Sequence, residues 1–233
     1  MTEIPSRRQA RAEQTRQKIL SAAEKHFSLL GFYGARIDEI AAEAGVNKRM
    51  IYEYFGNKED LYKIVLRKVY LLLGNSEEML FSGLSGAAPA DAIRLLVELY
   101  FSFLHQNPHY VRMLMWENLN EGQYFTEMNM GESRDPLKKA LHAILKRGQE
   151  AGIFRKELDE KHVLMTLFAC PFNYFSNRYT MQRIMETDFT SPAEIESRVS
   201  FTTDLLLTYL TAPAANRSQE VQSDAGNQMP QMQ

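Results

Sequence analysis

Two short helical patterns separated by a tight turn at Gly45-Val46 leave this chain few folds to adopt. The first pattern places four apolar residues on one face at helical spacing: Ile37, Ile40, Ala41 and Ala44. Gly45 then fits the left-handed backbone position that ends many helices. Asn47 is a suitable N-cap for the second pattern, which runs from Lys48 to Phe55 and stops at Gly56. Together they predict a helix-turn-helix.

The exposed face of the second helix carries side chains that suit DNA. A helix fits the major groove, where basic and hydroxyl groups meet phosphate oxygens and base edges. Ile51 and Phe55, four residues apart, are expected to point inward. The same pattern also occurs in small helical domains that do not bind DNA. The candidate DNA-binding residues on and beside this helix are Asn47, Lys48, Arg49, Met50, Tyr52, Tyr54 and Lys58.

The flanking segments make the pattern specific. Residues 16–30 form an amphipathic helical pattern that Gly31 ends, and a longer helix begins near Lys58 with acidic residues in its first turn. The stretch from Ile19 to Leu61 resembles the DNA-binding domain of the TetR (tetracycline-repressor) family of bacterial regulators. The residues that carry the resemblance are Ile19, Leu20, Ala22, Ala23, Phe27, Gly31, Phe32, Ile37, Ile40, Ala41, Ala44, Gly45, Val46, Tyr52, Phe55, Lys58 and Leu61.

Two positions depart from the usual family pattern. Members usually have Ser or Thr just before the first of the two short helices, where this chain has Ala35-Arg36. The missing side-chain cap costs about 1 kcal/mol, and Arg36 can reach a DNA phosphate instead. Members often carry Gly or Pro and Thr near the start of the second helix, where this chain has Arg49-Met50. Arginine is the commonest reader of guanine, so Arg49 is the predicted base reader, although a non-specific phosphate clamp fits it equally.

The resemblance also implies phosphate contacts around the second helix. The tyrosine that matches Tyr52 commonly contacts a phosphate in family members. Lys58 matches a lysine that tethers the start of the following helix to the DNA backbone, and a helix N-terminus favours phosphate. Lys48 is either a base reader or a phosphate contact. Tyr54 either approaches DNA or packs within the domain.

The overall net charge gives no support for DNA binding, but the charge of the N-terminal segment does. The overall formal charge of −2 does not suggest a nucleic-acid partner. The first segment, however, is locally basic and can lie along phosphates: it contains Arg7, Arg8, Arg11, Arg16 and Lys18.

No cofactor is expected. Cys170 is the only cysteine, and His105 and His109, one turn apart, would need further ligands to hold a metal ion. No apolar run is long enough to span a membrane, and the N-terminus lacks the apolar region of a signal peptide. We therefore expect a cytoplasmic protein, associated with the nucleoid when bound to DNA, and no membrane partner.

The remaining sequence shows helical spacing without strand alternation, so the predicted fold is all-α. It comprises an N-terminal three-helix helix-turn-helix domain, joined by a long helix from residue 60 to about 80 to a C-terminal helical domain for ligand binding and dimerisation. The predicted organisation is a flexible basic arm (1–12), a DNA-binding domain (13–60), the C-terminal domain (61–212) and a disordered tail (213–233).

The last two predicted helices, 161–185 with a bend at Pro171 and 195–209, are strongly apolar. The resemblance implies that they form a homodimer, although an intramolecular core explains them as well. A helix-turn-helix protein that reads double-stranded DNA at a palindromic operator needs two copies.

Large apolar side chains gather in the region where family members hold their inducer, and they predict a hydrophobic or aromatic small-molecule effector. Each of these residues also fits an ordinary core. The effector is expected to shift the connecting helix and thereby the spacing of the two reading helices. The candidate ligand-binding residues are Tyr100, Phe103, Leu104, His105, Met113, Trp116, Phe168 and Phe172.

The sequence therefore favours a dimeric, ligand-responsive transcriptional repressor without catalytic activity. One alternative is a DNA-binding protein that needs no ligand or that activates transcription. A helical enzyme is the other, but the chain has no phosphate-binding loop, nucleophile elbow, paired-histidine motif or Cys-His constellation.

Overall fold

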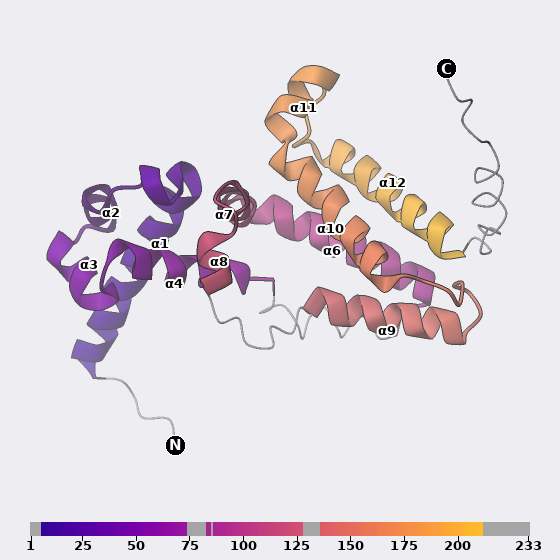
Figure 1. Cartoon of the computed structure of the whole chain (residues 1–233), viewed down its shortest axis with the longest axis horizontal. Coiled ribbons are helices and arrows are strands. Elements are labelled where there is room, and N and C mark those ends of the chain that lie inside the picture. Colours follow the sequence, from indigo (N-terminus) through magenta and orange to yellow (C-terminus); the bar gives the residue numbers. More distant parts are fainter. Residues whose placement is uncertain (1–5, 74–82, 85, 128–135, 212–233) are drawn as a thin grey trace, which may run out of the picture.

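The computed structural model describes residues 6–73, 83–84, 86–127 and 136–211, and the regular elements in these ranges are all α-helices. The predicted all-α fold is confirmed. Figure 1 shows two lobes with α7 and α8 where they meet. The N-terminal lobe contains α1 (Arg7–Gly34), α2 (Ile37–Ala44), α3 (Lys48–Phe55) and α4 (Lys58–Tyr70). The C-terminal lobe contains α6 (Pro89–Gln106), α9 (Pro136–Glu150), α10 (Glu160–Ser176), α11 (Arg178–Met185) and α12 (Pro192–Thr211), and the two junction helices are α7 (Pro108–Leu119) and α8 (Gln123–Glu127).

Local backbone chemistry sets the helix ends in the N-terminal lobe. Gly45 ends α2 in the left-handed conformation (φ 65°, ψ 36°), and its N–H donates to the Ala41 and Ala42 carbonyls. The Asn47 side chain accepts a hydrogen bond from the Arg49 N–H at 2.9 Å and caps α3. Arg36 precedes α2 without a side-chain cap. The predicted turn and its missing cap are both confirmed.

Three helix boundaries differ from the prediction. First, α1 begins at Arg7 because Ser6 and Gln9 form a capping box, so residues 7–12 are helical where we expected a flexible arm. Second, α4 ends at Tyr70 and residues 71–73 form turns, whereas we expected helix to about residue 80. The rest of that predicted helix, and the predicted tail from residue 213, lie outside the described residues.

Third, the predicted helix 161–185 consists of two helices that meet at Asn177. The Ser176 hydroxyl and the Asn177 side-chain amide both donate to the Asn173 carbonyl at 3.4 Å, beside the Asn177 backbone N–H at 3.0 Å. Short polar side chains compete with the helix in this way for backbone partners. Pro171 lies inside α10 and does not end it. The break directs α11 away from the axis of α10 (Figure 1).

The C-terminal lobe is organised around α6, which contacts α9, α10 and α12. One face of α6 is buried, with apolar side chains that are each at most 3% exposed: Ile93, Leu96, Val97, Tyr100 and Leu104. Aromatic rings link α6 to α10, and the Tyr100 and Phe168 centroids are 5.4 Å apart. This core holds α6 rigidly beside the junction between the lobes.

Helix α7 joins the lobes by packing against α1 and α4. Glu117 of α7 is 3% exposed and accepts two hydrogen bonds. The Tyr62 hydroxyl of α4 donates to its Oε1 at 2.7 Å, and the Phe125 backbone N–H donates to its Oε2 at 3.0 Å. Burial, together with the bond to Glu117, raises the pKa of Tyr62 above its ordinary value, so this hydroxyl remains a donor. A buried polar network thus fixes the N-terminal lobe to α7.

Glu117→Ala is expected to lower the free energy of unfolding by about 2–4 kcal/mol, because the Tyr62 hydroxyl and the Phe125 N–H would lose their buried acceptor. Glu117→Gln is expected to cost less, since its amide oxygen can accept from Phe125 while its amide N–H donates to Tyr62. Urea unfolding followed by circular dichroism measures both changes. Equal stability of Glu117→Ala and the wild type would contradict the role assigned to this network.

Candidate DNA-binding surface and junction cavity

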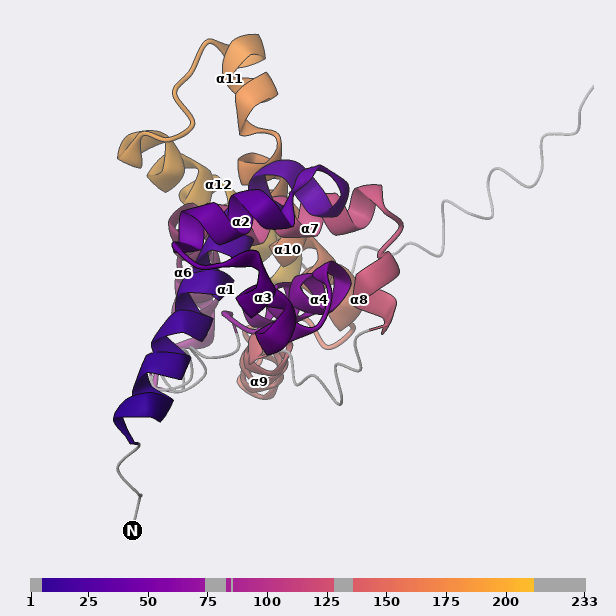
Figure 2. The same cartoon turned by 90° about the vertical axis from the view of Figure 1, so that its left-hand side faces the viewer.

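Helix α3 has one face in the core and the other in solvent. Ile51 is 1% exposed and Phe55 is 5% exposed, as the sequence predicted. On the opposite face Lys48 and Arg49 are exposed, and Tyr52 is 44% exposed. In Figure 2, α2 and α3 lie at the front of the molecule with α4 behind them. A helix with a buried face and a basic, hydroxyl-bearing outer face can enter a major groove without disturbing the core.

Arg49 lies largely in solvent, with 85% of its side chain exposed. Its Nε donates to Glu53 Oε1 at 2.8 Å, one helical turn away. An exposed pair at this spacing contributes only about 0.3–0.5 kcal/mol, so DNA can displace it. We did not predict Glu53 as a site residue, although the four-residue spacing from Arg49 is a visible signal. A glutamate can also accept a hydrogen bond from the cytosine amino group.

The other predicted DNA-binding residues lie around α3 in different settings. Lys48 Nζ bonds Asp38 across the turn at 2.9 Å, and this bond raises the pKa of Lys48, so it stays charged. Lys58, in the first turn of α4, has its ammonium 4.8 Å from the centroid of the Phe32 ring, and burial lowers its pKa. The remaining predicted residues are exposed Arg36 and Asn47, half-buried Met50, and half-buried Tyr54, which packs against the core beside Phe55.

The N-terminal half of α1 adds basic groups to the same lobe. Arg7, Arg8 and Arg11 are exposed, and Figure 2 shows this part of α1 extending beyond the other helices. Arg16 lies over the Phe55 ring at 5.4 Å from its centroid, which ties α1 to the end of α3. The basic segment is therefore carried on a helix whose direction is fixed relative to α3.

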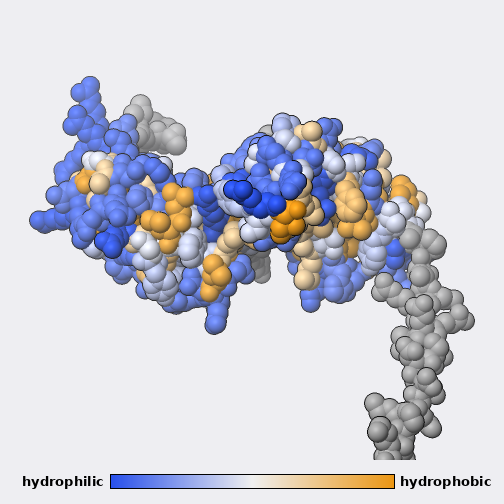
Figure 3. Space-filling view, turned by 90° about the horizontal axis from the view of Figure 1, so that it is seen from above, coloured by the Kyte–Doolittle hydropathy of each residue, from blue (hydrophilic) through white to orange (hydrophobic). Residues whose placement is uncertain are grey.

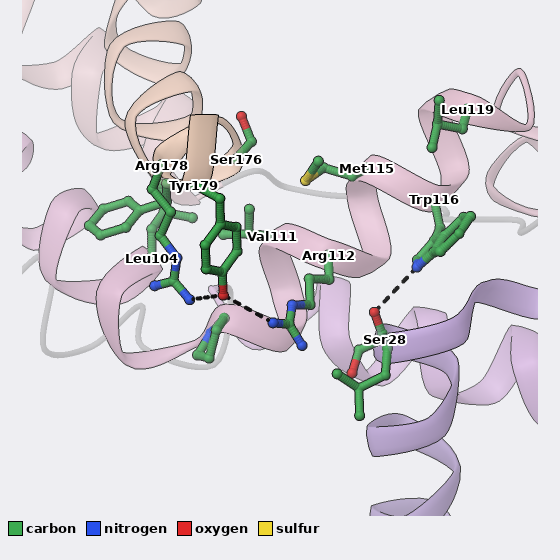
Figure 4. Close-up of a pocket in the computed structure, with 13 residues that line it drawn as sticks. Ser28, Leu104, Val111, Arg112, Met115, Trp116, Leu119, Ser176, Arg178 and Tyr179 are labelled. Carbon is green, nitrogen blue, oxygen red and sulfur yellow. Dashed lines mark hydrogen bonds between the residues drawn. The ribbon is translucent and has the colours of Figure 1, made fainter. Parts of the chain in front are cut away.

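A cavity of about 240 Å³ opens at the junction of the lobes, between the end of α1, α7 and the start of α11 (Figure 4). Its walls are mostly apolar. The larger lining side chains are Leu29, Leu104, Val111, Met115, Trp116 and Phe175. Because the cavity touches both α1 and α11, an occupant would contact the DNA-binding lobe and the C-terminal lobe at once.

Of the eight predicted ligand-binding residues, Leu104 and Trp116 line this cavity. The others lie elsewhere around α6, α7 and α10. Met113 is fully buried, Tyr100 packs on Phe168, and the Phe103 and Tyr110 rings are 4.9 Å apart. His105 is exposed beside Phe175, and Phe172 is half-buried against the core.

The charged groups of the cavity come from residues that we did not predict. Arg112 of α7 and Arg178 of α11 both donate to the Tyr179 hydroxyl oxygen, at 3.2 Å and 2.7 Å. The bonds from Arg178 and then Arg112 lower the pKa of Tyr179. The helix break at Asn177 places Arg178 and Tyr179 at this point, and the sequence pattern of a single long helix concealed it.

Trp116 connects the cavity to the DNA-binding lobe. Its Nε1–H donates to the Ser28 carbonyl of α1 at 3.3 Å (Figure 4). Ser28 Oγ and His109 Nδ1 share a hydrogen bond of 2.6 Å. His109 is therefore engaged at the junction. In the described part of the chain no three His, Cys, Asp or Glu side chains are grouped to hold a metal ion, and no helix there has the length and apolar content to cross a membrane.

Two family models match this sequence. The model described as "Bacterial regulatory proteins, tetR family" matches residues 19–65, which contain α2 and α3. The model described as "Tetracyclin repressor-like, C-terminal domain" matches residues 89–206, from the first residue of α6 into α12. Both lobes are thus matched separately.

Curated relatives agree with the two models. The chain is 33% identical over 201 residues to the HTH-type transcriptional repressor NicS of Pseudomonas putida, covering 86% of this chain and 94% of NicS. It is 29% identical over 171 residues to the HTH-type transcriptional regulator RutR of Escherichia coli K12, covering 72% of this chain and 77% of RutR. Both relatives are named as regulators of transcription.

Solved structures share the fold. The transcriptional regulator FadR from Bacillus subtilis, in complex with stearoyl-CoA, superposes with a TM-score of 0.61 at 20% identity, covering 84% of this chain and 99% of FadR. The hemolysin II transcriptional regulator HlyIIR superposes with a TM-score of 0.55 at 23% identity, covering 86% of this chain and 99% of HlyIIR.

Proposed function

This chain belongs to the TetR family of bacterial transcriptional regulators, and on that premise we propose that it is a homodimeric repressor of a palindromic operator, released by a small hydrophobic or aromatic effector. As a family member it binds DNA through a helix-turn-helix and is not an enzyme. The observation that carries the proposal is α3, whose inner face is buried and whose outer face presents Arg49, Lys48 and Tyr52.

Within this proposal the residues around α3 divide by role. Arg49 reads a base, because its side chain is exposed and its partner Glu53 is on the same exposed face. Tyr52, Lys58 and Arg36 contact phosphates, which sets the position of α3 but carries no sequence information. Lys48 holds the turn through Asp38 and faces the backbone of the DNA.

The C-terminal lobe supplies the proposed dimer interface. Large apolar side chains on α10 and α12 stay exposed in the single chain: Met165 is 55% exposed, Phe201 59% and Leu205 47%. Figure 3 shows apolar groups interrupting the polar surface of this lobe. Large exposed apolar residues on two helices that contact each other are typical of an interaction surface. A pair of chains joined there carries two copies of α3, as a two-fold operator requires.

The effector is proposed to bind in the C-terminal lobe beside the junction. FadR, which shares this fold, is solved with stearoyl-CoA, a ligand with a long apolar tail. From the predicted set, Leu104 and Trp116 are the proposed direct contacts because they line the cavity. The other six do not line it: His105 is exposed, and the remaining five are buried or half-buried, where a ligand reaches them only if the core rearranges.

Footprinting on the DNA upstream of the chain's own gene tests the proposal. We expect the wild type to protect an inverted repeat, with protection falling steeply as salt rises. Phe201→Glu places a charge in the proposed interface and is expected to yield monomers that protect no DNA at the same concentration. Ile153→Glu, at a residue 42% exposed and outside α10 and α12, is the matched control and is expected to behave as the wild type.

Light scattering coupled to gel filtration measures the oligomeric state of the three proteins. A Phe201→Glu protein that remains dimeric and protects the repeat would show that the interface lies elsewhere. Protection that no small molecule relieves would favour the alternative of a ligand-independent DNA-binding protein.

A further inference from the structure

One end of the junction cavity holds two guanidinium groups without an acidic partner. Among the described residues, neither Arg112 nor Arg178 has a carboxylate oxygen within 4.0 Å of its side-chain nitrogens. Instead both donate to the neutral Tyr179 oxygen, from opposite sides in Figure 4. Two like charges that converge on one neutral atom repel each other, and an anion placed between them would remove that repulsion.

The Tyr179 hydroxyl adds a third donor at the same point. A phenol has one proton to donate and lone pairs to accept, and here the oxygen accepts from both arginines. Its own proton has no acceptor among the described residues. The free N–H groups of the two guanidiniums and this proton therefore form a cluster of donors that has no further protein acceptor among the described residues and is open to solvent, since Tyr179 is 58% exposed. A carboxylate, which has two oxygens and accepts several hydrogen bonds, is complementary to it.

The remainder of the cavity accommodates an apolar group. Its side walls include Val111, Met115 and Trp116, and none of the described Asp or Glu residues lines it. Its volume of about 240 Å³ is below the range of roughly 300–1,000 Å³ that is usual for drug-sized ligands. The occupant is therefore small, with one charged end and one apolar end.

We propose that this cavity binds a small monocarboxylate, with the carboxylate held by Arg112, Arg178 and Tyr179 and the apolar body packed against Trp116 and Met115. The proposal rests on the function proposed above, because it gives the chemical class of the effector. It also assigns to Arg112, Arg178 and Tyr179 a specificity that neither the family likeness nor the sequence pattern assigned.

The same ligand would act directly on the DNA-binding lobe. Ser28 and Leu29, near the end of α1, form the wall opposite α11. Trp116 bonds the Ser28 carbonyl, so movement of the indole on binding is transmitted to α1. A ligand lowers operator affinity only if it binds more tightly to an arrangement that binds DNA poorly. A body wedged between α1 and α11 changes the angle of α1, which packs against α2 and α4, and these two helices in turn hold α3.

Fluorescence titration of the full-length protein tests the assignment, because Trp116 is the only tryptophan in the chain. The probes are 3-phenylpropanoate and octanoate, each compared with its neutral amide of the same shape. We expect at least one acid to bind, and to bind about tenfold or more tightly than its amide, since a charged hydrogen bond is lost in the amide. Arg112→Gln and Arg178→Gln are each expected to weaken the binding of that acid by about tenfold or more and to leave the binding of the amide unchanged.

Arg183→Gln is the matched control, because Arg183 is exposed on α11 and does not line the cavity. It is expected to bind acid and amide as the wild type does. Unchanged amide binding by the Arg112 and Arg178 variants also shows that they fold. Calorimetry with the same probes provides a measurement that does not depend on the indole.

Four outcomes would overturn the proposal: neither acid binds, acid and amide bind alike, the Arg112 and Arg178 variants bind the acid as tightly as the wild type, or the bound acid leaves operator protection unchanged. These failures leave the proposed repressor function standing if footprinting shows a protected repeat. Conversely, selective acid binding by a protein that protects no DNA sequence would support the carboxylate site and contradict the repressor function.

Discussion

Arg49→Ala is expected to reduce the protein's preference for its operator over unrelated DNA by roughly 5- to 150-fold per half-site, the effect of about 1–3 kcal/mol for a lost bidentate arginine–guanine contact. The reason is that Arg49 is 85% exposed, so it gives up little packing when it turns toward a base. In a dimer both half-sites lose the contact, and the losses in free energy add. This is the largest effect that we expect from any single exposed side chain.

Competition binding between operator and scrambled DNA at fixed salt measures this preference. Lys58→Ala is the comparison. Loss of a phosphate contact should weaken binding to both DNAs alike, and it should reduce the slope of the salt dependence of binding by about one unit. If Arg49→Ala keeps the wild-type ratio of affinities, Arg49 is the phosphate clamp that its sequence also allowed, and the base reader is another residue of α3.

Gly31→Ala is expected to destabilise the protein by about 2–6 kcal/mol. Gly31 has φ 67° and ψ −179°, a region that residues other than glycine occupy at a cost of about 1–3 kcal/mol. A Cβ there would lie 2.8 to 3.0 Å from three carbons of the Trp116 indole, and such overpacking costs about 1–3 kcal/mol more. The substitution would thus push α1 away from α7 at the junction cavity.

Urea unfolding of three Gly→Ala variants separates the cost of backbone strain from the cost of steric overlap with Trp116. At Gly86 an added Cβ meets nothing within 4 Å and φ is not positive, so Gly86→Ala is expected to be nearly neutral. At Gly152 the space is also open but φ is +69°, so Gly152→Ala reports backbone strain alone. If Gly31→Ala costs no more than Gly152→Ala, the close approach of Trp116 to Gly31 does not restrain the junction.

Adding Trp116→Leu to Gly31→Ala should restore the stability that is lost through overlap with the indole. It should not restore the stability that is lost through the positive φ. A double-mutant cycle across Gly31 and Trp116 gives this coupling directly. A coupling near zero would mean that the two residues do not share a contact in solution.

The features that the sequence predicted correctly depend on neighbours close along the chain. Gly45 ends α2 because only its own backbone must become left-handed, and Asn47 caps α3 through a bond to the N–H two residues later. The inward positions of Ile51 and Phe55 follow from helical spacing alone. The arrangement of the helices into two lobes was predicted from the family resemblance and not from local sequence patterns.

The features that the sequence did not predict depend on contacts between distant segments. The cavity brings Ser28, Arg112 and Tyr179 together from three helices, and no spacing rule relates them. The break at Asn177 escaped prediction because the apolar pattern continues on both sides, whereas the Ser176 and Asn177 side chains compete for the Asn173 carbonyl. Met113 and Tyr100 were predicted to contact a ligand because their side chains are large and apolar. Both instead pack in the core beside the cavity.

Sequencing the DNA that the purified full-length protein retains from a random pool tests most directly whether α3 reads sequence. We expect one enriched inverted repeat whose half-sites are centred about one helical turn, roughly 10 base pairs, or a multiple of it apart. Arg49→Ala should enrich a motif that is degenerate at the position that the wild type specifies. No enriched motif at low salt, or the same motif from both proteins, would contradict sequence reading by Arg49 on α3.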